Sequence, residues 1–182
     1  RAGECEMGAL IADAMLESVK SQGVQIAIQN GGGIRASLDT GEVTMGEILT
    51  ILPFQNTLST FRVSGATLLA ALENGVSQVE EGAGRFPQVA GLTYAFDPAG
   101  TVGKRVSDVR VLHSGRAVPL DPVKLYSVVS NNYLRNGGDG YKMFKAAQDV
   151  YDFGPDLADI VAEYKAAHAP YQPYLAGRII EK

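Results

Sequence analysis

The stretch that decides the fold is Val24-Gln25-Ile26-Ala27-Ile28, which leads into Asn30-Gly31-Gly32-Gly33-Ile34-Arg35. The first five residues have the pattern of a β-strand, and this strand delivers the chain to a turn of three glycines. Successive glycines cost backbone entropy on folding, so they occur where φ must be positive or where another group approaches the backbone closely. A second such turn, Asn136-Gly137-Gly138-Asp139-Gly140, follows a strand-like segment at 124–130. The two turns are therefore candidate binding loops.

The hydrophobic pattern around these turns predicts a mixture of helices and strands. Thr44 followed by Glu47 is a capping-box pattern, which predicts a short helix running into Pro53. Helical spacing of apolar residues predicts further helices, and alternation predicts strands; the helices are expected at 5–20, 66–79, 141–147 and 156–167, and the strands at 24–28, 56–63, 88–95, 105–112, 124–130 and 177–181. Because helices and strands interleave irregularly, we expect an α+β fold with mixed sheets and helices packed outside them, and not a doubly wound parallel sheet.

Length and composition indicate one globular domain over residues 1–182, with 46% apolar residues and 20% charged residues. The net charge of −4 provides no basic field for a nucleic-acid polymer. We see no apolar run long enough for a membrane span. The single cysteine, Cys5, neither supports nor excludes an oxidising compartment. Since the chain begins at Arg1 instead of Met, we expect it to be a fragment or processed product of a longer protein.

Neither glycine turn fits a familiar phosphate-binding motif. No Lys-Ser/Thr pair follows the glycines as in a P-loop, and no long helix follows them as in a dinucleotide-binding turn. Two tight structural turns are the simplest alternative. The flanking residues favour binding, because the Arg35 guanidinium suits phosphate or carboxylate oxygens and Asp139 can accept hydrogen bonds from vicinal hydroxyls. Phe54 and Tyr133 could stack on a planar base, although core packing is the commoner fate of a lone aromatic.

With these residues, the chain resembles the C-terminal domain of the 5′-nucleotidase family. This family includes bacterial UDP-sugar hydrolases, 2′,3′-cyclic-nucleotide phosphodiesterases and vertebrate ecto-5′-nucleotidase. The resemblance spans nearly the whole chain and implies layers in the order α/β/β/α. It is carried by five ordered motifs, at residues 4–8 with 13–15, 30–35, 52–54, 88–92 and 136–140.

The resemblance implies a substrate-binding role for seven residues. Phe54 and Tyr133 correspond to the two aromatics that stack on the base, and Asp139 to the acceptor of the ribose hydroxyls. Asn30 and Gly32 belong to the same pocket, Arg35 is a substrate or phosphate contact, and Arg1 lies where the family often has another substrate-binding arginine. Several members have Phe where this chain has Tyr133, which keeps the ring and adds a hydroxyl.

In this family a separate N-terminal metallophosphoesterase domain holds two divalent metal ions and the catalytic residues. The composition of this chain agrees with that division, because His113 and His168 are its only histidines and neither lies in a metal-ligand pattern. Cys5 is expected to pack and not to act as a nucleophile, and Glu80-Glu81 to be solvated. We therefore expect no cofactor, metal ligand or catalytic residue in this chain, and no activity from it alone.

The predicted function is nucleoside or nucleotide recognition within a metal-dependent 5′-nucleotidase, with its own N-terminal domain as partner. The resemblance also implies a periplasmic or extracellular location. Three relatives in the superfamily remain as alternatives: a cyclic-nucleotide phosphodiesterase, a UDP-sugar hydrolase and a thiosulfohydrolase. A non-catalytic ligand-binding module is the alternative from another class.

Overall fold

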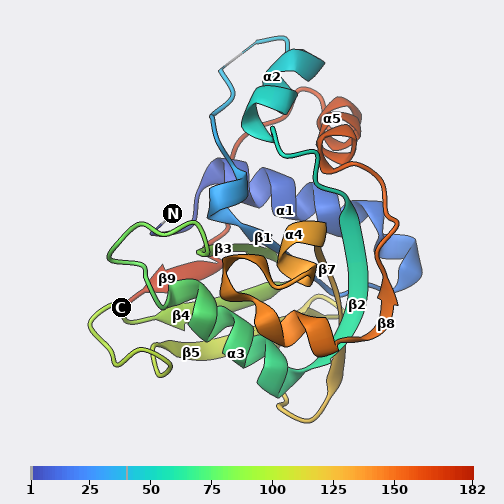
Figure 1. The fold of residues 1–182 in the computed structure, drawn as a ribbon. Coiled ribbons are helices and arrows are strands. Elements are labelled where there is room, and N and C mark those ends of the chain that lie inside the picture. The colour runs from blue at the N-terminus through green and yellow to red at the C-terminus, as the bar shows by residue number, and fades with distance from the viewer. Residues whose placement is uncertain (1, 40) are drawn as a thin grey trace.

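The structure is a computed structural model, and it describes residues 2–39 and 41–182. Five α-helices and nine strands, joined by short 3₁₀ turns, make up this part of the chain (Figure 1). The helices are α1 (Glu6–Ser18), α2 (Met45–Ile51), α3 (Gly65–Val76), α4 (Asn132–Arg135) and α5 (Leu157–Ala167). The strands are β1 (Ile26–Asn30), β2 (Leu58–Ser64), β3 (Pro87–Ala90), β4 (Leu92–Phe96), β5 (Val106–His113), β6 (Arg116–Pro119), β7 (Leu125–Asn131), β8 (Gln148–Tyr151) and β9 (Ile179–Glu181).

The strands form two mixed sheets. The larger has the order β3-β1-β7-β2-β8, and the smaller has the order β6-β5-β4-β9. In the larger sheet, β1 and β7 run parallel, with Ile28 opposite Ser130, and β2 runs antiparallel to β7, with Leu58 opposite Asn131. In the smaller sheet, β9 runs parallel to β4 and β5 antiparallel to it. The α+β prediction is confirmed.

Two apolar cores lie on opposite faces of the larger sheet. On one face, α1, α2 and α5 pack over buried residues that include Ile11, Met15 and Val129. On the other face, α3 and the smaller sheet enclose a second core around Phe61 and Phe96. Helix α3 contacts β2 and β3 of the larger sheet and β5 of the smaller one, and it runs beside β5 in Figure 1.

The prediction of one strand at 88–95 is wrong, because Gly91 divides this segment into two strands. Residues Pro87–Ala90 form β3 of the larger sheet, and residues Leu92–Phe96 form β4 of the smaller one. Gly91 has φ of +72°, and a Cβ there would lie 2.0 Å from the carbonyl oxygen of Gln25. Only glycine fits such a bend beside another backbone. Continuous hydrophobicity across the bend concealed it in the sequence.

The other predicted elements occur within a few residues of their expected bounds. The capping box is present, since Thr44 Oγ1 accepts from the Glu47 amide and Glu47 Oε2 accepts from the Thr44 amide. The short helix expected at 141–147 is a 3₁₀ helix, Lys142–Ala146. Two strands were missed, β6 and β8, and most of their residues are exposed. Exposed edge strands lack the alternation of buried and solvated residues that sequence patterns detect.

Three charged residues join α3 and the loop after it to the start of β5. Arg105 is buried, and its guanidinium binds both carboxylate oxygens of Glu80 and the carbonyl of Val76. Glu73 accepts hydrogen bonds from the amides of Arg105 and Val106, at 3.0 and 2.9 Å. Glu80 was expected to be solvated, and its side chain is 51% exposed. It also balances the charge of the buried Arg105, and that hydrogen bond lowers the pKa of its carboxyl.

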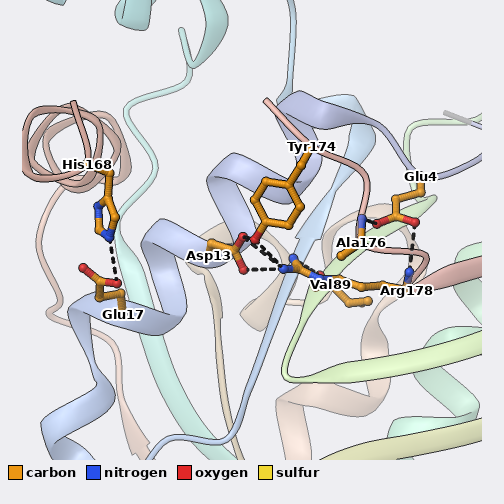
Figure 2. A network of polar contacts seen from close by, with 8 residues as sticks. All are labelled: Glu4, Asp13, Glu17, Val89, His168, Tyr174, Ala176 and Arg178. Carbon is orange, nitrogen blue, oxygen red and sulfur yellow. Dashed lines mark hydrogen bonds and ion pairs between the residues drawn. The ribbon is translucent and has the colours of Figure 1, made fainter. Parts of the chain in front are cut away.

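A polar network fastens the segment after α5 to α1 (Figure 2). The Arg178 guanidinium lies 2.8 Å from Asp13 on α1 and also donates to the carbonyl of Val89. The Tyr174 hydroxyl donates to Asp13 at 2.6 Å. Glu4 accepts from the amides of Ala176 and Arg178, which completes the attachment.

We expect Asp13→Ala to destabilise the fold by about 3 kcal/mol. The side chains of Asp13 and Arg178 are each only 14% exposed, so the substitution leaves a largely desolvated guanidinium without its counter-ion. Urea unfolding followed by circular dichroism measures the change.

The matched control is Lys182→Ala. Lys182 pairs with Asp108 at 2.6 Å, but both side chains are about half exposed, at 49% and 62%. Solvent screening limits such a pair to less than about 1 kcal/mol. Equal losses in the two variants would show that Asp13 contributes no more than a surface pair.

Candidate functional site

The predicted site residues gather where β1 and β7 end. Because these strands are parallel, their carboxyl ends lie at one edge of the larger sheet. Asn30 ends β1 and opens the triple-glycine turn, and Asn131 ends β7 and caps α4. β2 begins at the same edge, where the Thr57 amide donates to the side chain of Asn132 at 3.2 Å. Three chain segments distant in sequence therefore meet there.

Asp139 lies at the centre of this edge and contacts two of the other predicted residues. Its Oδ2 accepts from the Asn30 carboxamide at 2.7 Å, and its Oδ1 accepts from the Tyr133 hydroxyl at 3.0 Å. This hydrogen bond raises the pKa of Tyr133, so the phenol stays neutral. The Asp139 backbone is left-handed, with φ of 50°, and Asn74 donates to its carbonyl at 3.1 Å. The carboxylate is thus held in one orientation.

Gly32 is the point at which the first turn touches a third loop. Its amide donates to the carbonyl of Gly84 at 2.7 Å. A Cβ on Gly32 would lie 2.8 Å from the Gly84 Cα, and a Cβ on Gly84 would lie 3.5 Å from Asp139 Oδ2. The close approach of these two backbones therefore shapes the wall beside Asp139.

The remaining predicted residues lie at the same edge but are less constrained. Tyr133 is 46% exposed, with its ring close against Gly138, and Phe54 is 55% exposed in the turn before β2. The exposed Arg35 guanidinium donates to the Gly32 carbonyl at 3.5 Å. No hydrogen bond or ion pair joins Phe54 or Arg35 to Asp139 in residues 2–39 and 41–182. Arg1 lies outside the residues that the structure describes.

An open groove of about 1350 Å³ adjoins the site at Arg35. Its walls come from the start of α1, from the loop after Arg35 and from the segment after α5. They are mostly apolar, and include Met7, Leu10, Ile34, Val43 and Pro170.

Sequence reasoning missed the buried amides behind the site. Asn131 is fully buried, and its carboxamide donates to Asn30 Oδ1 at 3.0 Å and to Gln29 Oε1 at 2.9 Å. Asn74 on α3 was missed as well. The sequence did carry a signal for Gln29 and Asn131. Gln29-Asn30 and Asn131 are polar residues at the ends of strands that are otherwise mostly apolar. Buried side-chain amides need hydrogen-bond partners, and here the amides of Gln29, Asn30 and Asn131 are hydrogen-bonded to one another.

The residues considered for metal binding or nucleophilic chemistry have other surroundings. His168 stacks on Tyr164 and lies 3.5 Å from Glu17, and His113 is exposed on β5. Cys5 caps α1, where its Sγ accepts from the Gly8 amide. Across the described ranges, no three His, Cys, Asp or Glu side chains are grouped to hold a metal ion. The helices in those ranges are also too short or too polar to cross a bilayer.

We expect Gly32→Ala to lower stability by about 1–3 kcal/mol, because the new methyl group would force the Gly84 backbone away. Thermal unfolding measures the loss. Gly46→Ala in α2 is the matched control, since its Cβ would meet only Thr44 Oγ1, at 3.8 Å. In a helix this second change is neutral or stabilising. A Gly32→Ala variant as stable as Gly46→Ala would contradict the close packing described here.

Comparisons with known proteins identify the family. The model of the 5′-nucleotidase C-terminal domain matches residues 1–146. The chain is 41% identical to the trifunctional nucleotide phosphoesterase YfkN of Bacillus subtilis, across all of this chain and 13% of that protein. It is 34% identical to human 5′-nucleotidase, across 97% of this chain and 33% of the relative.

A solved structure, that of a 5′-nucleotidase precursor from Thermus thermophilus, superimposes with a TM-score of 0.96 at 46% identity. The alignment covers 98% of this chain and 36% of that one. This chain thus spans about a third or less of the length of these relatives. The family match and the superposition agree, and the chain belongs to the 5′-nucleotidase C-terminal domain family.

Proposed function

We propose that this chain is the substrate-binding domain of a larger, metal-dependent 5′-nucleotidase, which hydrolyses nucleotides to nucleoside and phosphate. One observation carries the proposal. A carboxylate, Asp139, is held between Asn30 and Tyr133 at an exposed edge of the sheet, with solvent-exposed aromatic rings at the same edge. The names of the relatives, which include nucleotidases and a nucleotide phosphoesterase, support it.

Each part of a nucleoside has a partner of suitable chemistry at this edge. Each Asp139 oxygen accepts one hydrogen bond from Asn30 or Tyr133, which leaves capacity on both oxygens for neighbouring ribose hydroxyls. The rings of Phe54 and Tyr133 offer faces on which a base stacks. The exposed Arg35 guanidinium provides a donor fork for the anionic part of a nucleotide.

The reaction itself belongs to the part of the protein that this chain does not include. Two divalent metal ions in an N-terminal metallophosphoesterase domain would activate water and stabilise the charge that develops on the phosphate. The domain described here would raise the effective concentration of substrate at those metals by holding the nucleoside. By its family, the whole protein would act in the periplasm or outside the cell.

The alternatives differ in what the site must recognise. A UDP-sugar hydrolase would keep the base and ribose contacts and differ beyond the phosphate. The substrate of a 2′,3′-cyclic-nucleotide phosphodiesterase would keep the base contacts but offer Asp139 no free 2′- and 3′-hydroxyls. A thiosulfohydrolase or a non-catalytic module needs no stacked base. The exposure of Phe54 and Tyr133, at 55% and 46%, favours a nucleoside ligand, because burial in the core would have removed both rings from use.

We expect Phe54→Ala and Tyr133→Ala each to weaken adenosine binding about fivefold to a hundredfold, the range for loss of one base–aromatic stack. Calorimetric or NMR titration with adenosine measures the affinity. Leu112→Ala on β5 is the control, because Leu112 is a comparably exposed apolar residue (48%) on the other sheet. If all three variants bind adenosine as the unsubstituted chain does, the stacking assignment is wrong.

We also expect this chain alone to hydrolyse no 5′-nucleotide. Phosphate release from adenosine 5′-monophosphate, with and without added divalent metal, measures this directly. Activity that persists through repurification and chelation would contradict the division of labour between domains.

A further inference from the structure

Asp139 is held by a chain of hydrogen bonds whose direction is fixed at its buried end. The chain begins at the main-chain amide of Leu134, which donates to Asn131 Oδ1 at 2.8 Å. A main-chain N–H can only donate, so this bond decides which end of the Asn131 carboxamide carries the oxygen. Its nitrogen must then point the other way, toward Asn30.

The next links follow from that choice. Asn131 Nδ2 donates to Asn30 Oδ1 at 3.0 Å, and Gln29 Nε2 donates to the same oxygen at 3.3 Å. With its oxygen occupied by two donors, Asn30 presents its nitrogen to Asp139 Oδ2, at 2.7 Å. Asn131 is fully buried and Asn30 is 3% exposed, so water cannot easily replace a lost link.

The Tyr133 hydroxyl holds Asp139 from the exposed side. It donates to Oδ1 at 3.0 Å and accepts from the Asp139 amide at 3.3 Å. It therefore fixes both the side chain and the left-handed backbone of one residue. The same tyrosine has two separable parts: a ring that offers a stacking face, and a hydroxyl directed at the carboxylate.

We propose that Asn131 and Tyr133 are positioning residues, with Tyr133 acting through its hydroxyl. They orient Asp139 to receive two neighbouring hydroxyls, and so make the pocket prefer nucleosides that carry a 2′,3′-diol. The inference rests on the proposed function, because it concerns how the same pocket selects its ligand. Both groups act through Asp139. A preorganised acceptor costs less to bind than one that must be ordered on binding.

The test compares adenosine with 2′,3′-dideoxyadenosine, which keeps the base and the 5′-hydroxyl but lacks the diol. NMR titration of the chain gives both affinities for the unsubstituted protein, for Tyr133→Phe and for Asn131→Asp. Tyr133→Phe keeps the ring and removes only the hydroxyl. Asn131→Asp keeps the size and still accepts from Leu134, but as a carboxylate it cannot donate to Asn30. Tyr151→Phe is the control, since Tyr151 is a comparably exposed tyrosine (55%) on β8.

We expect the unsubstituted chain to prefer adenosine, and Tyr133→Phe to reduce that preference about threefold to tenfold, roughly the worth of one hydrogen bond. The change should come from weaker adenosine binding, with the affinity for dideoxyadenosine unaltered. Asn131→Asp should reduce the preference at least as much, and Tyr151→Phe should leave it unchanged. If Tyr133 and Asn131 acted only in stacking or in stability, the affinities for both nucleosides would change in parallel.

Tyr133→Phe decides the question even if Asn131→Asp does not fold. A Tyr133→Phe chain with full preference for the diol would overturn the inference and leave the proposed function intact. Tighter adenosine binding by this variant would also overturn it, because the hydroxyl would then be a competitor of the ribose. If the unsubstituted chain binds neither nucleoside, the proposed function fails and the inference fails with it.

Discussion

The parallel pairing of β1 with β7 is the constraint on which the site depends. These strands are about a hundred residues apart in sequence, with Ala27 opposite Val129 and Ile28 opposite Ser130. Both are buried on both faces, so a shift of register by one residue would move apolar side chains from one core into the other. The register thus places Asn30 and Asn131 side by side, and the two glycine turns begin from that point. Pairing in the sheet, and not the turns themselves, sets the geometry of the candidate pocket.

Much of this architecture could be predicted from local signals. The capping box at Thr44, the helical spacing of α1 and α5 and the strand before the first glycine turn each depend on a few adjacent residues. The bend at Gly91 could not be predicted, because its reason is the Gln25 carbonyl, which belongs to a distant part of the chain. β6 and β8 escaped for a different reason: their residues are mostly exposed, so burial leaves little pattern in them.

The candidate site divides in the same way. Asn30, Tyr133 and Asp139 could be chosen by their chemistry and by the family resemblance, and the structure links them by hydrogen bonds. Asn131 and Asn74 were missed, although Asn131 is a polar residue at the end of a mostly apolar strand, because the value of a buried amide depends on which partners the fold brings to it. Phe54 and Arg35 stay predictions of the sequence, since no hydrogen bond or ion pair links either to Asp139 in the described part of the chain.

The bend at Gly91 has a mechanical consequence. β3 lies beside β1, with Pro87 opposite Asn30, and β4 lies beside β9, so one uninterrupted stretch of backbone belongs to both sheets. The loop that carries Gly84 enters β3 directly and touches Gly32. Displacement of the smaller sheet would therefore pull on the pocket wall through covalent bonds and not only through side-chain packing. The pocket wall is thus attached covalently to a strand that continues, through the bend at Gly91, into the smaller sheet.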